Sequence, residues 1–213
     1  MQLSDVHRLA ARGEGLHIEF KKKATHPEKI VRELVALANT EGGHLLIGVD
    51  DDGTVSGQRF IEEEIFVMEN AIEKYIRPAL GYELSLFKLN EKKGVAVFYV
   101  ACSPNRPHLV KEGTQRQAYV RVADRSIKAS REMWEILKRI DRPDAAVFTY
   151  GEKETKLMQL LQEKGQITVH EYARAAELPI FLASRTLVRL VLANVLEILP
   201  REEQQDLFQM KAT

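Results

Sequence analysis

A short apolar segment bounded by glycines constrains this chain more than any other feature. The segment Leu45–Val49 lies between the pair Gly42-Gly43 and the turn-forming run Asp50-Asp51-Asp52-Gly53. Apolar runs of this length between turn residues are typical of buried strands. The Asp-Gly step predicts a hairpin that continues into residues 54–57. We therefore expect a buried strand that ends at a cluster of carboxylates.

The residues before this strand predict another strand and a helix. Ile18 and Phe20 alternate with Glu19 and Lys21, so the apolar pair is expected to face the core and the charged pair the opposite side. Apolar residues then recur every three or four positions, which predicts an amphipathic helix over residues 27–39. We therefore expect a site that combines the Glu19 carboxylate with the aspartates that follow the buried strand.

The rest of the first 142 residues also predicts alternating secondary structure. Two helices are expected over 60–77 and 133–140, and strands are expected over 82–88, 95–100 and 117–122. Periodicity stops at 141–146, where a proline lies among charged residues. The prediction is a mixed-sheet α+β domain over 1–142, a linker over 143–150 and a second domain over 151–213.

The C-terminal segment has the element order of a winged-helix form of the helix-turn-helix. Helices are expected over 154–162, 169–176 and 182–195, a small strand over 166–168, and a hairpin formed by 196–199 and 206–210. Thr168 and Glu171 match a capping box at the start of the second helix. The third helix is expected to begin at Ser184 and to expose Arg185, Thr186 and Arg189 to a groove.

Composition narrows the class of protein. The 213 residues are 45% hydrophobic, and no apolar run is long enough to span a membrane. The amino-terminal residues lack the apolar centre of a secretory signal, which predicts a cytoplasmic protein. A single cysteine, Cys102, excludes an internal disulfide framework and a cysteine zinc cluster. His17, His44 and His108 do not share metal-ligand spacing and are expected at the surface or in strands.

The spaced motifs resemble those of the Schlafen AlbA-type domain. The residues that carry the resemblance are Glu14, Glu19-Phe20-Lys21, Ala38-Asn39-Thr40, Gly42-Gly43, Gly48-Val49-Asp50-Asp51 and Gly57. A looser likeness extends through residues 119–122 and the following helix. The resemblance implies a nucleic-acid-binding or regulatory module, or an enzyme that cuts RNA, because the family includes both.

The resemblance also implies a candidate catalytic site. Glu14, Glu19 and Asp51 match the positions that hold a divalent metal in nuclease members of the family, where Mg²⁺ or Mn²⁺ activates water. Lys21, on the same strand face as Glu19, would neutralise a phosphate oxygen. The alternative is structural: aspartates commonly form turns, and Glu14 can equally cap a short helix before the strand.

Local basic patches are the candidate nucleic-acid contacts, because the chain has 31 basic and 31 acidic residues and net charge favours no partner. The candidates are Lys21, Lys22, Lys23, Arg121, Arg125, Arg185 and Arg189. Our hypothesis from the sequence is a DNA-binding transcriptional regulator that acts as a homodimer. We expect it to bind DNA rather than RNA and not to associate with a membrane. A metal-dependent endoribonuclease and a protein-docking or dimerisation module are the two alternatives.

Overall fold

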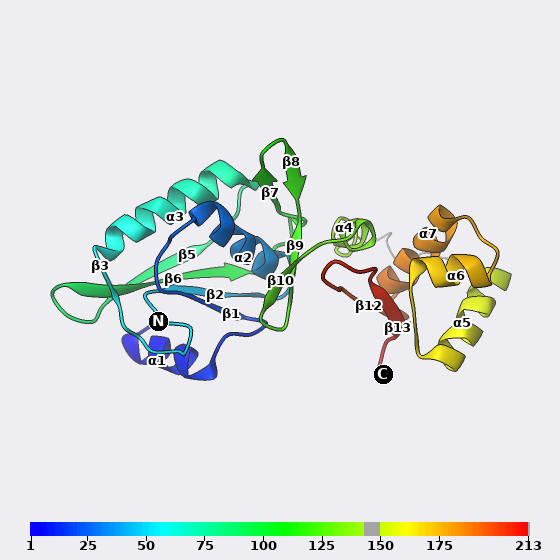
Figure 1. Ribbon diagram of the computed structural model, residues 1–213, viewed down its shortest axis with the longest axis horizontal. Helices are drawn as coiled ribbons and strands as arrows, with labels where there is room; N and C mark the ends of the chain where they lie inside the picture. Colours follow the sequence, from blue (N-terminus) through cyan, green and yellow to red (C-terminus); the bar gives the residue numbers. More distant parts are fainter. Residues whose placement is uncertain (143–149, 213) are drawn as a thin grey trace. The chain divides into compact units, whose positions relative to one another are not determined.

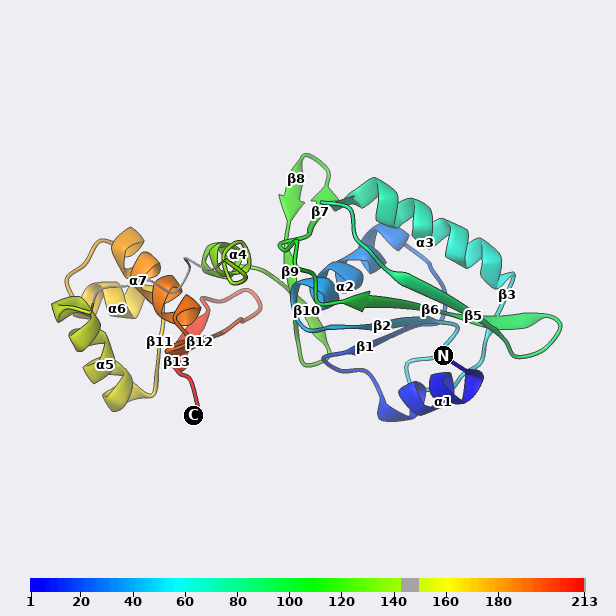
Figure 2. The ribbon, with the colours of Figure 1, turned by 180° about the vertical axis from the view of Figure 1, so that it is seen from behind.

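The computed structural model describes residues 1–142 and 150–212 and divides the chain into two compact units. Unit 1 is Met1–Lys128 and unit 2 is Ala129–Thr213. The ribbon is coloured along the sequence in Figure 1, and Figure 2 shows it from behind. In the described part of the chain, no helix is long and apolar enough to cross a membrane.

Unit 1 is built on a mixed five-stranded sheet. Its strands are β1 (Ile18–Lys21), β2 (Gly42–Ile47), β3 (Gln58–Arg59), β5 (Glu83–Lys88) and β6 (Lys93–Ala101). The strands β1 and β2 are parallel, whereas β6 is antiparallel to β2, β3 and β5. The predicted mixed α+β class is therefore confirmed.

Helices cover both faces of this sheet, as Figures 1 and 2 show. The helices α2 (Pro27–Asn39) and α3 (Ile61–Tyr75) pack on one face, and α1 (Leu3–Arg12) packs on the other. Because side chains alternate along a strand, Leu45 and Ile47 of β2 join the core under α2 and α3, while Leu46 joins the core under α1. The central strand is thus buried on both faces, as its apolar run predicts.

Two smaller β-structures complete unit 1. The strands β4 (Ile76–Arg77), β7 (Leu109–Glu112) and β8 (Gln115–Gln117) form a three-stranded sheet in the order β4-β7-β8. The strands β9 (Tyr119–Val122) and β10 (Arg125–Lys128) form a separate hairpin, and β9 packs against α2. The single strand predicted over 117–122 is therefore two strands with different partners.

The turn after β2 differs in part from its prediction. The backbone reverses at the aspartate run, where Gly53 N–H donates to Asp50 O (2.9 Å) and Asp50 N–H donates to Thr54 O (2.9 Å). The turn is therefore present, but residues 54–57 are not a strand. Strand pairing resumes at β3, which lies against the start of β6.

Unit 2 contains a helical group and a small antiparallel sheet. Its helices are α4 (Arg131–Leu137), α5 (Glu152–Lys164), α6 (Val169–Ala175) and α7 (Ile180–Leu192), and its strands are β11 (Gln166–Ile167), β12 (Leu196–Leu199) and β13 (Leu207–Met210). The sheet order is β11-β13-β12. A core of Leu157, Tyr172, Leu187 and Phe208 joins the helices to the sheet.

Helix α4 belongs to unit 2, whereas the sequence boundary at residue 142 assigns it to the first domain. It packs against α7, where Ser184 Oγ donates to Glu132 Oε1 (2.6 Å). Ser130, at the N-cap of α4, donates to Asp206 Oδ2 (2.5 Å). Periodicity identifies an apolar helix face but not the face it packs against, which accounts for the difference. The predicted linker, 143–150, lies outside the described residues except for Tyr150.

The start of α7 also differs from its prediction. The helix begins at Ile180, directly after Pro179, and therefore includes one turn more than expected before Ser184. Thr186 is only 4% exposed, so the prediction that it faces a groove is wrong. The predicted capping box is confirmed, because Thr168 accepts from Glu171 N–H (3.2 Å) and Glu171 accepts from Thr168 N–H (2.8 Å).

The glycine pair of the motif begins β2 and allows a close approach of neighbouring backbone. A Cβ on Gly43 would lie 2.4 Å from His17 O, and a Cβ on Gly42 would lie 2.7 Å from Val100 O. Both residues have positive φ, 79° for Gly42 and 158° for Gly43. Glycine is therefore required by packing between β1 and β6, and not only by a turn.

We expect Gly43→Ala to lower the free energy of unfolding by about 2 kcal/mol or more, because the added methyl meets backbone that cannot move aside alone. Urea denaturation followed by circular dichroism measures the change. Gly81→Ala is the matched control, because a Cβ there meets nothing within 4 Å, and its effect should stay within about 0.5 kcal/mol. Equal stability of the two variants would contradict the close-packing role.

Candidate functional site

The side chain of Arg121, on β9, lies at the centre of the candidate site. It has 0% exposed surface and contacts carboxylates from two other elements. One terminal nitrogen lies 2.6 Å from Glu19 Oε2 of β1, and the other lies 2.8 Å from Glu33 Oε2 of α2. Arg121 therefore joins the first strand, the first covering helix and the last hairpin of unit 1.

Backbone and hydroxyl oxygens accept the remaining contacts of this guanidinium. Arg121 Nε donates to Gly15 O (3.0 Å), and a terminal nitrogen donates to Ile18 O (3.2 Å). Ser126 Oγ lies 3.2 Å from the nitrogen that contacts Glu33, and it also donates to the Glu33 carboxylate. A planar guanidinium suits such a site because its donors point in fixed directions.

The charges around Arg121 are mutually compensated. Lys21 Nζ donates to Glu19 Oε1 and to Phe20 O (2.9 Å), which places a second cation beside Glu19. We call the set Glu19, Lys21, Glu33, Arg121 and Ser126 the Arg121 network. It contains two carboxylates and two cations, so burial leaves no net charge.

The pKa values of two members follow from this arrangement. Burial raises the pKa of Glu33, and the charge of Glu19 adds to the increase, while the bond from Ser126 and the charge of Arg121 oppose it. Burial alone would lower the pKa of Lys21, but the hydrogen bond and charge of Glu19 outweigh that effect and raise it. Lys21 is therefore held in its charged form by Glu19.

The Asn39-Thr40 step of the motif fixes the backbone of β9 next to α2. The buried Asn39 amide donates to His108 O (3.0 Å) and Tyr119 O (2.9 Å), and its oxygen accepts from His108 N–H (2.7 Å). Thr40 Oγ1 accepts from Arg121 N–H (2.8 Å). These two residues therefore position the backbone of β9 so that the Arg121 side chain reaches its carboxylate partners.

Glu14 lies near the network without being part of it. Its Oε1 accepts from Phe20 N–H (2.8 Å), so it stabilises the start of β1 instead of capping α1. Partial burial raises the pKa of Glu14; the Phe20 bond opposes the increase and the charge of Glu19 adds to it. Of the predicted catalytic residues, the structure therefore brings Glu14, Glu19 and Lys21 together.

Asp51 lies apart, on the exposed turn after β2. Its neighbour Asp50 pairs with Lys22 (2.7 Å), and the hydrogen bond from Lys22 lowers the pKa of Asp50. Asp52 Oδ1 accepts from Thr54 N–H (2.8 Å), as expected of a turn former. Two of the three aspartates therefore have structural contacts, Asp50 with Lys22 after β1 and Asp52 within the turn.

The carboxylates as arranged do not fit a divalent metal. Both oxygens of Glu19 contact cations, Lys21 and Arg121, which would repel Mg²⁺ or Mn²⁺ at the same position. Across residues 1–142 and 150–212, no three histidine, cysteine, aspartate or glutamate side chains form a group that could hold a metal ion.

The predicted nucleic-acid contacts in unit 1 fall into two groups. Arg121 is fully buried, so its predicted contact with phosphate is not compatible with this structure. Lys21 is half-buried in the same network. Lys22, Lys23 and Arg125 are exposed, although Lys22 is paired with Asp50. In unit 2, Arg185 is exposed and Arg189 is partly exposed on α7.

The roles of several residues in and near the Arg121 network were not predicted from the sequence. Glu33 and Ser126 belong to no motif and are recognisable only when α2 and β10 are placed beside β9. His108 was expected at the surface or in a strand, yet it is buried, with Nε2 2.7 Å from Ser103 Oγ. Burial lowers the pKa of His108, and the bond to Pro78 O opposes the decrease.

Comparison with known proteins identifies a family for most of unit 1. The sequence model described as Schlafen, AlbA_2 matches residues 14–130, which is more than half of the chain. No curated protein matches the sequence.

Similar solved structures include the following two. The DIP2311 protein from Corynebacterium diphtheriae is 20% identical with a TM-score of 0.48, and the match covers 98% of this chain and 38% of that one. The N-terminal domain of a putative ATP-dependent DNA helicase RecG-related protein from Nitrosomonas europaea is 23% identical with a TM-score of 0.43, and the match covers 57% of this chain and 88% of that one. The present chain therefore spans well under half the length of the DIP2311 chain.

We expect Arg121→Met to lower the free energy of unfolding by about 3–5 kcal/mol, because it leaves two buried carboxylates without their shared cation. Chemical denaturation monitored by circular dichroism measures the loss. Arg116→Ala, on the exposed surface of β8, is the control and should change stability by about 0.5 kcal/mol or less.

A second substitution keeps this test informative if Arg121→Met folds poorly. Adding Glu33→Gln to Arg121→Met removes one of the unpaired charges and should recover part of the lost stability. A double variant that is less stable than Arg121→Met would show that charge compensation is not what Arg121 provides.

Proposed function

Because the chain belongs to the Schlafen AlbA_2 family, we propose that it is a nucleic-acid-binding protein, and specifically a transcriptional regulator that contacts duplex DNA through α7. The family includes nucleic-acid-binding modules, which supports the general part of this proposal. Arg185, which is exposed on α7, and Arg189, which is partly exposed there, support the specific part.

The topology of unit 2 supports a winged-helix assignment. The chain order α5-β11-α6-α7-β12-β13, with the sheet order β11-β13-β12, is the order expected of a winged helix-turn-helix. In such units the helix that follows the turn enters the major groove. Here that helix is α7.

The exposed surface of α7 provides two cations on one face. Arg185 and Arg189 are four residues apart, which places them one helical turn from each other. The face that carries Ser184 is covered by α4, so the arginines mark the side available to a ligand. Arginine at this position provides contacts to phosphate oxygens and to guanine edges.

The first residues of α7 favour a second candidate function, self-association. Ile180 is 53% exposed and Phe181 is 61% exposed. Large apolar side chains that are exposed together are typical of protein interfaces. A homodimer that covered Phe181 would remove the start of α7 from any groove, so the two candidates predict different effects of the arginine substitutions.

The endoribonuclease alternative receives less support from the geometry. In that function Glu14, Glu19 and Asp51 would share Mg²⁺ or Mn²⁺, and Lys21 would contact phosphate. Glu19 instead neutralises Lys21 and Arg121, and Asp51 lies on the separate turn after β2. We therefore derive no catalytic step for these residues.

The double substitution Arg185→Ala/Arg189→Ala should weaken binding to duplex DNA roughly tenfold or more and reduce the slope of log affinity against log salt by about 2. Fluorescence anisotropy with a labelled mixed-sequence duplex at several salt concentrations measures both quantities. Lys156→Ala, an exposed cation of α5, is the control for loss of charge alone.

Two results would contradict duplex binding through α7. One is a double variant that binds duplex as tightly as the wild type. The other is a wild type that gives no salt-dependent binding but sediments as a dimer that Phe181→Ser dissociates, which would favour self-association.

We expect labelled structured RNA and duplex DNA to be retarded on a gel but not cleaved, with either Mn²⁺ or a chelator present. The reason is that Glu14, Glu19 and Asp51 are not arranged to bind a metal ion together. Both bound and cut products are scored in the same lanes. Mn²⁺-dependent cleavage that Asp51→Ala and Glu19→Gln abolish would establish the nuclease instead.

A further inference from the structure

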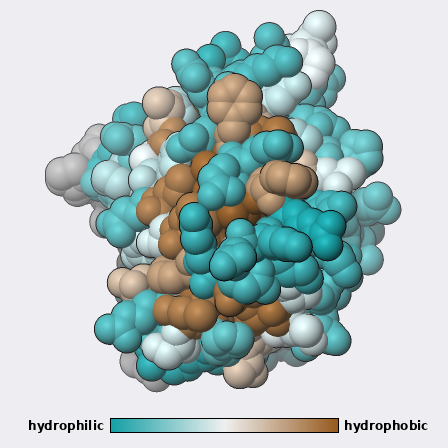
Figure 3. Space-filling model, turned by 90° about the vertical axis from the view of Figure 1, so that its left-hand side faces the viewer, coloured by the Kyte–Doolittle hydropathy of each residue, from teal (hydrophilic) through white to brown (hydrophobic). Residues whose placement is uncertain are grey.

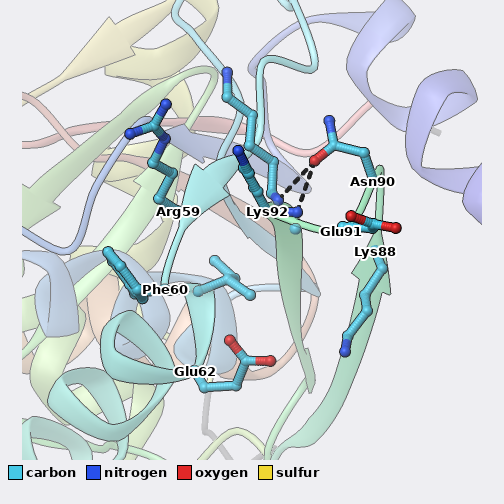
Figure 4. A pocket seen from close by; sticks show the side chains of 10 residues that line it. Arg59, Phe60, Glu62, Lys88, Asn90, Glu91 and Lys92 are labelled. Atoms are coloured by element: carbon cyan, nitrogen blue, oxygen red, sulfur yellow. Dashed lines mark hydrogen bonds between the residues drawn. The ribbon is translucent and has the colours of Figure 1, made fainter.

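A pocket of about 400 Å³ lies in unit 1 between the start of α3 and the turn that joins β5 to β6. Figure 4 shows Arg59 and Phe60 on one side of this pocket, Lys88, Asn90 and Glu91 on the other, and Lys92 between them. Its volume falls within the range of roughly 300–1,000 Å³ typical of small-ligand sites. None of its lining residues belongs to the Arg121 network.

The aromatic ring of Phe60 is the most unusual part of the pocket. It is 69% exposed, and its backbone is left-handed with φ 54°, a conformation that bulky residues rarely adopt. The left-handed backbone at Phe60 costs conformational energy, and the side chain that it carries just before α3 is exposed to solvent. Figure 3 views the side on which β3 and the β5–β6 turn lie in Figure 1, and apolar patches lie there among hydrophilic side chains.

Four of the residues that line the pocket with Phe60 are cations. Arg59, Lys88 and Lys92 are exposed, and in the described part of the chain none of the three is held in an ion pair. Lys93 adds a fourth cation, although its Nζ donates to Ser56 O (3.0 Å). Two carboxylates, Glu62 and Glu91, also line the pocket, so four cations face two anions. The excess of positive charge favours an anionic ligand.

The walls of the pocket are held in place by the sheet. Asn90 Oδ1 accepts from Lys92 N–H and Lys93 N–H (2.9 Å each), which fixes the turn, as the dashed lines of Figure 4 show. Lys88 pairs with Gly94 on one side of β6, and Arg59 pairs with Lys93 on the other. Arg59, Lys88 and Lys93 are therefore carried by paired backbone, and Lys92 lies in the turn that Asn90 fixes, so these cations need little reorganisation to bind.

We propose that this pocket binds one nucleotide of a single-stranded nucleic acid, with its base stacked on Phe60 and its phosphate among Arg59, Lys88 and Lys92. An exposed aromatic face combined with a positively charged groove is the combination that binds single strands, because every base has a face that stacks and every linkage is anionic. This inference rests on the proposed binding of nucleic acid but not on α7. It gives unit 1 a contact with unpaired bases.

The test is the affinity of the full chain for a labelled twelve-residue oligothymidylate, measured by fluorescence anisotropy. Phe60→Ala should weaken binding roughly tenfold, because one base loses its stacking partner. Phe60→Asn removes the ring and suits the left-handed backbone, so it should weaken binding equally without strain. Phe60→Trp should retain affinity.

The matched control is Phe66→Ala. Phe66 is 67% exposed on α3, the helix that follows Phe60, but does not line this pocket, so its loss should leave the affinity unchanged. For the cations, Lys92→Ala should reduce the salt slope by about 1, whereas Lys74→Ala, on the last turn of α3, should not. Thymidine monophosphate should compete only weakly, because a strand makes contacts beyond one nucleotide.

Two outcomes would overturn the inference whatever the duplex measurements give: no binding of oligothymidylate by the wild type, or equal affinity of the wild type and both Phe60→Ala and Phe60→Asn. Thymidine monophosphate that competes as well as the oligonucleotide would overturn the assignment to a strand. The Arg185→Ala/Arg189→Ala variant should bind oligothymidylate like the wild type. Failure of the arginine substitutions to weaken duplex binding would therefore count against α7 without affecting the pocket. Failure of the Phe60 substitutions to weaken oligothymidylate binding would count against the pocket without affecting α7.

Discussion

The compensation of the buried Arg121 charge is the constraint on which unit 1 depends. A guanidinium with no exposed surface is tolerated only when carboxylates and backbone oxygens replace water around it. Glu19, Glu33 and the carbonyl of Gly15 provide that replacement from segments far apart in the sequence. The Asn39-Thr40 step holds β9 so that these contacts form. The motif residues Glu19, Asn39 and Thr40 therefore also determine how the β9–β10 hairpin attaches to the rest of unit 1.

Local patterns predicted most of the elements, and the tertiary contacts account for what they did not. Alternation and three-to-four spacing predicted β1, β2, α2 and the order of elements in unit 2, because each depends on neighbours within a few residues. The place of α4 depends on its contact with α7, which is distant in sequence, and has no local signal. Glu33 likewise lies on a helix whose pattern shows only that its face is polar. The motif predicted the proximity of Glu14, Glu19 and Lys21, but the burial of Arg121 required the position of β9.

Exposure separates the basic residues that hold the fold from those available to a ligand. A chain with equal numbers of acidic and basic residues has no general attraction for nucleic acid. Arg121 and Lys21 are committed to carboxylates, whereas the pocket cations and Arg185 face solvent. The two proposed contacts also differ in chemistry, since α7 presents arginines suited to a duplex and Phe60 presents a ring suited to an unpaired base. In these proposals, the choice between duplex and unpaired bases depends on the side chains exposed at each site and not on the net charge of the chain.

The contact between Arg121 and Glu19 spans 102 positions of sequence, which has a consequence for how the protein is made. At roughly 5–20 residues per second, β9 leaves the ribosome about 5–20 s after β1. During that interval Glu19 has no guanidinium partner and remains hydrated, so β1 cannot be buried in its final surroundings. Local helices can form at once, but completion of the sheet waits for the last hairpin, as expected where distant segments must meet. Biosynthesis of unit 1 therefore includes a stage in which water solvates the Glu19 carboxylate in place of the Arg121 guanidinium.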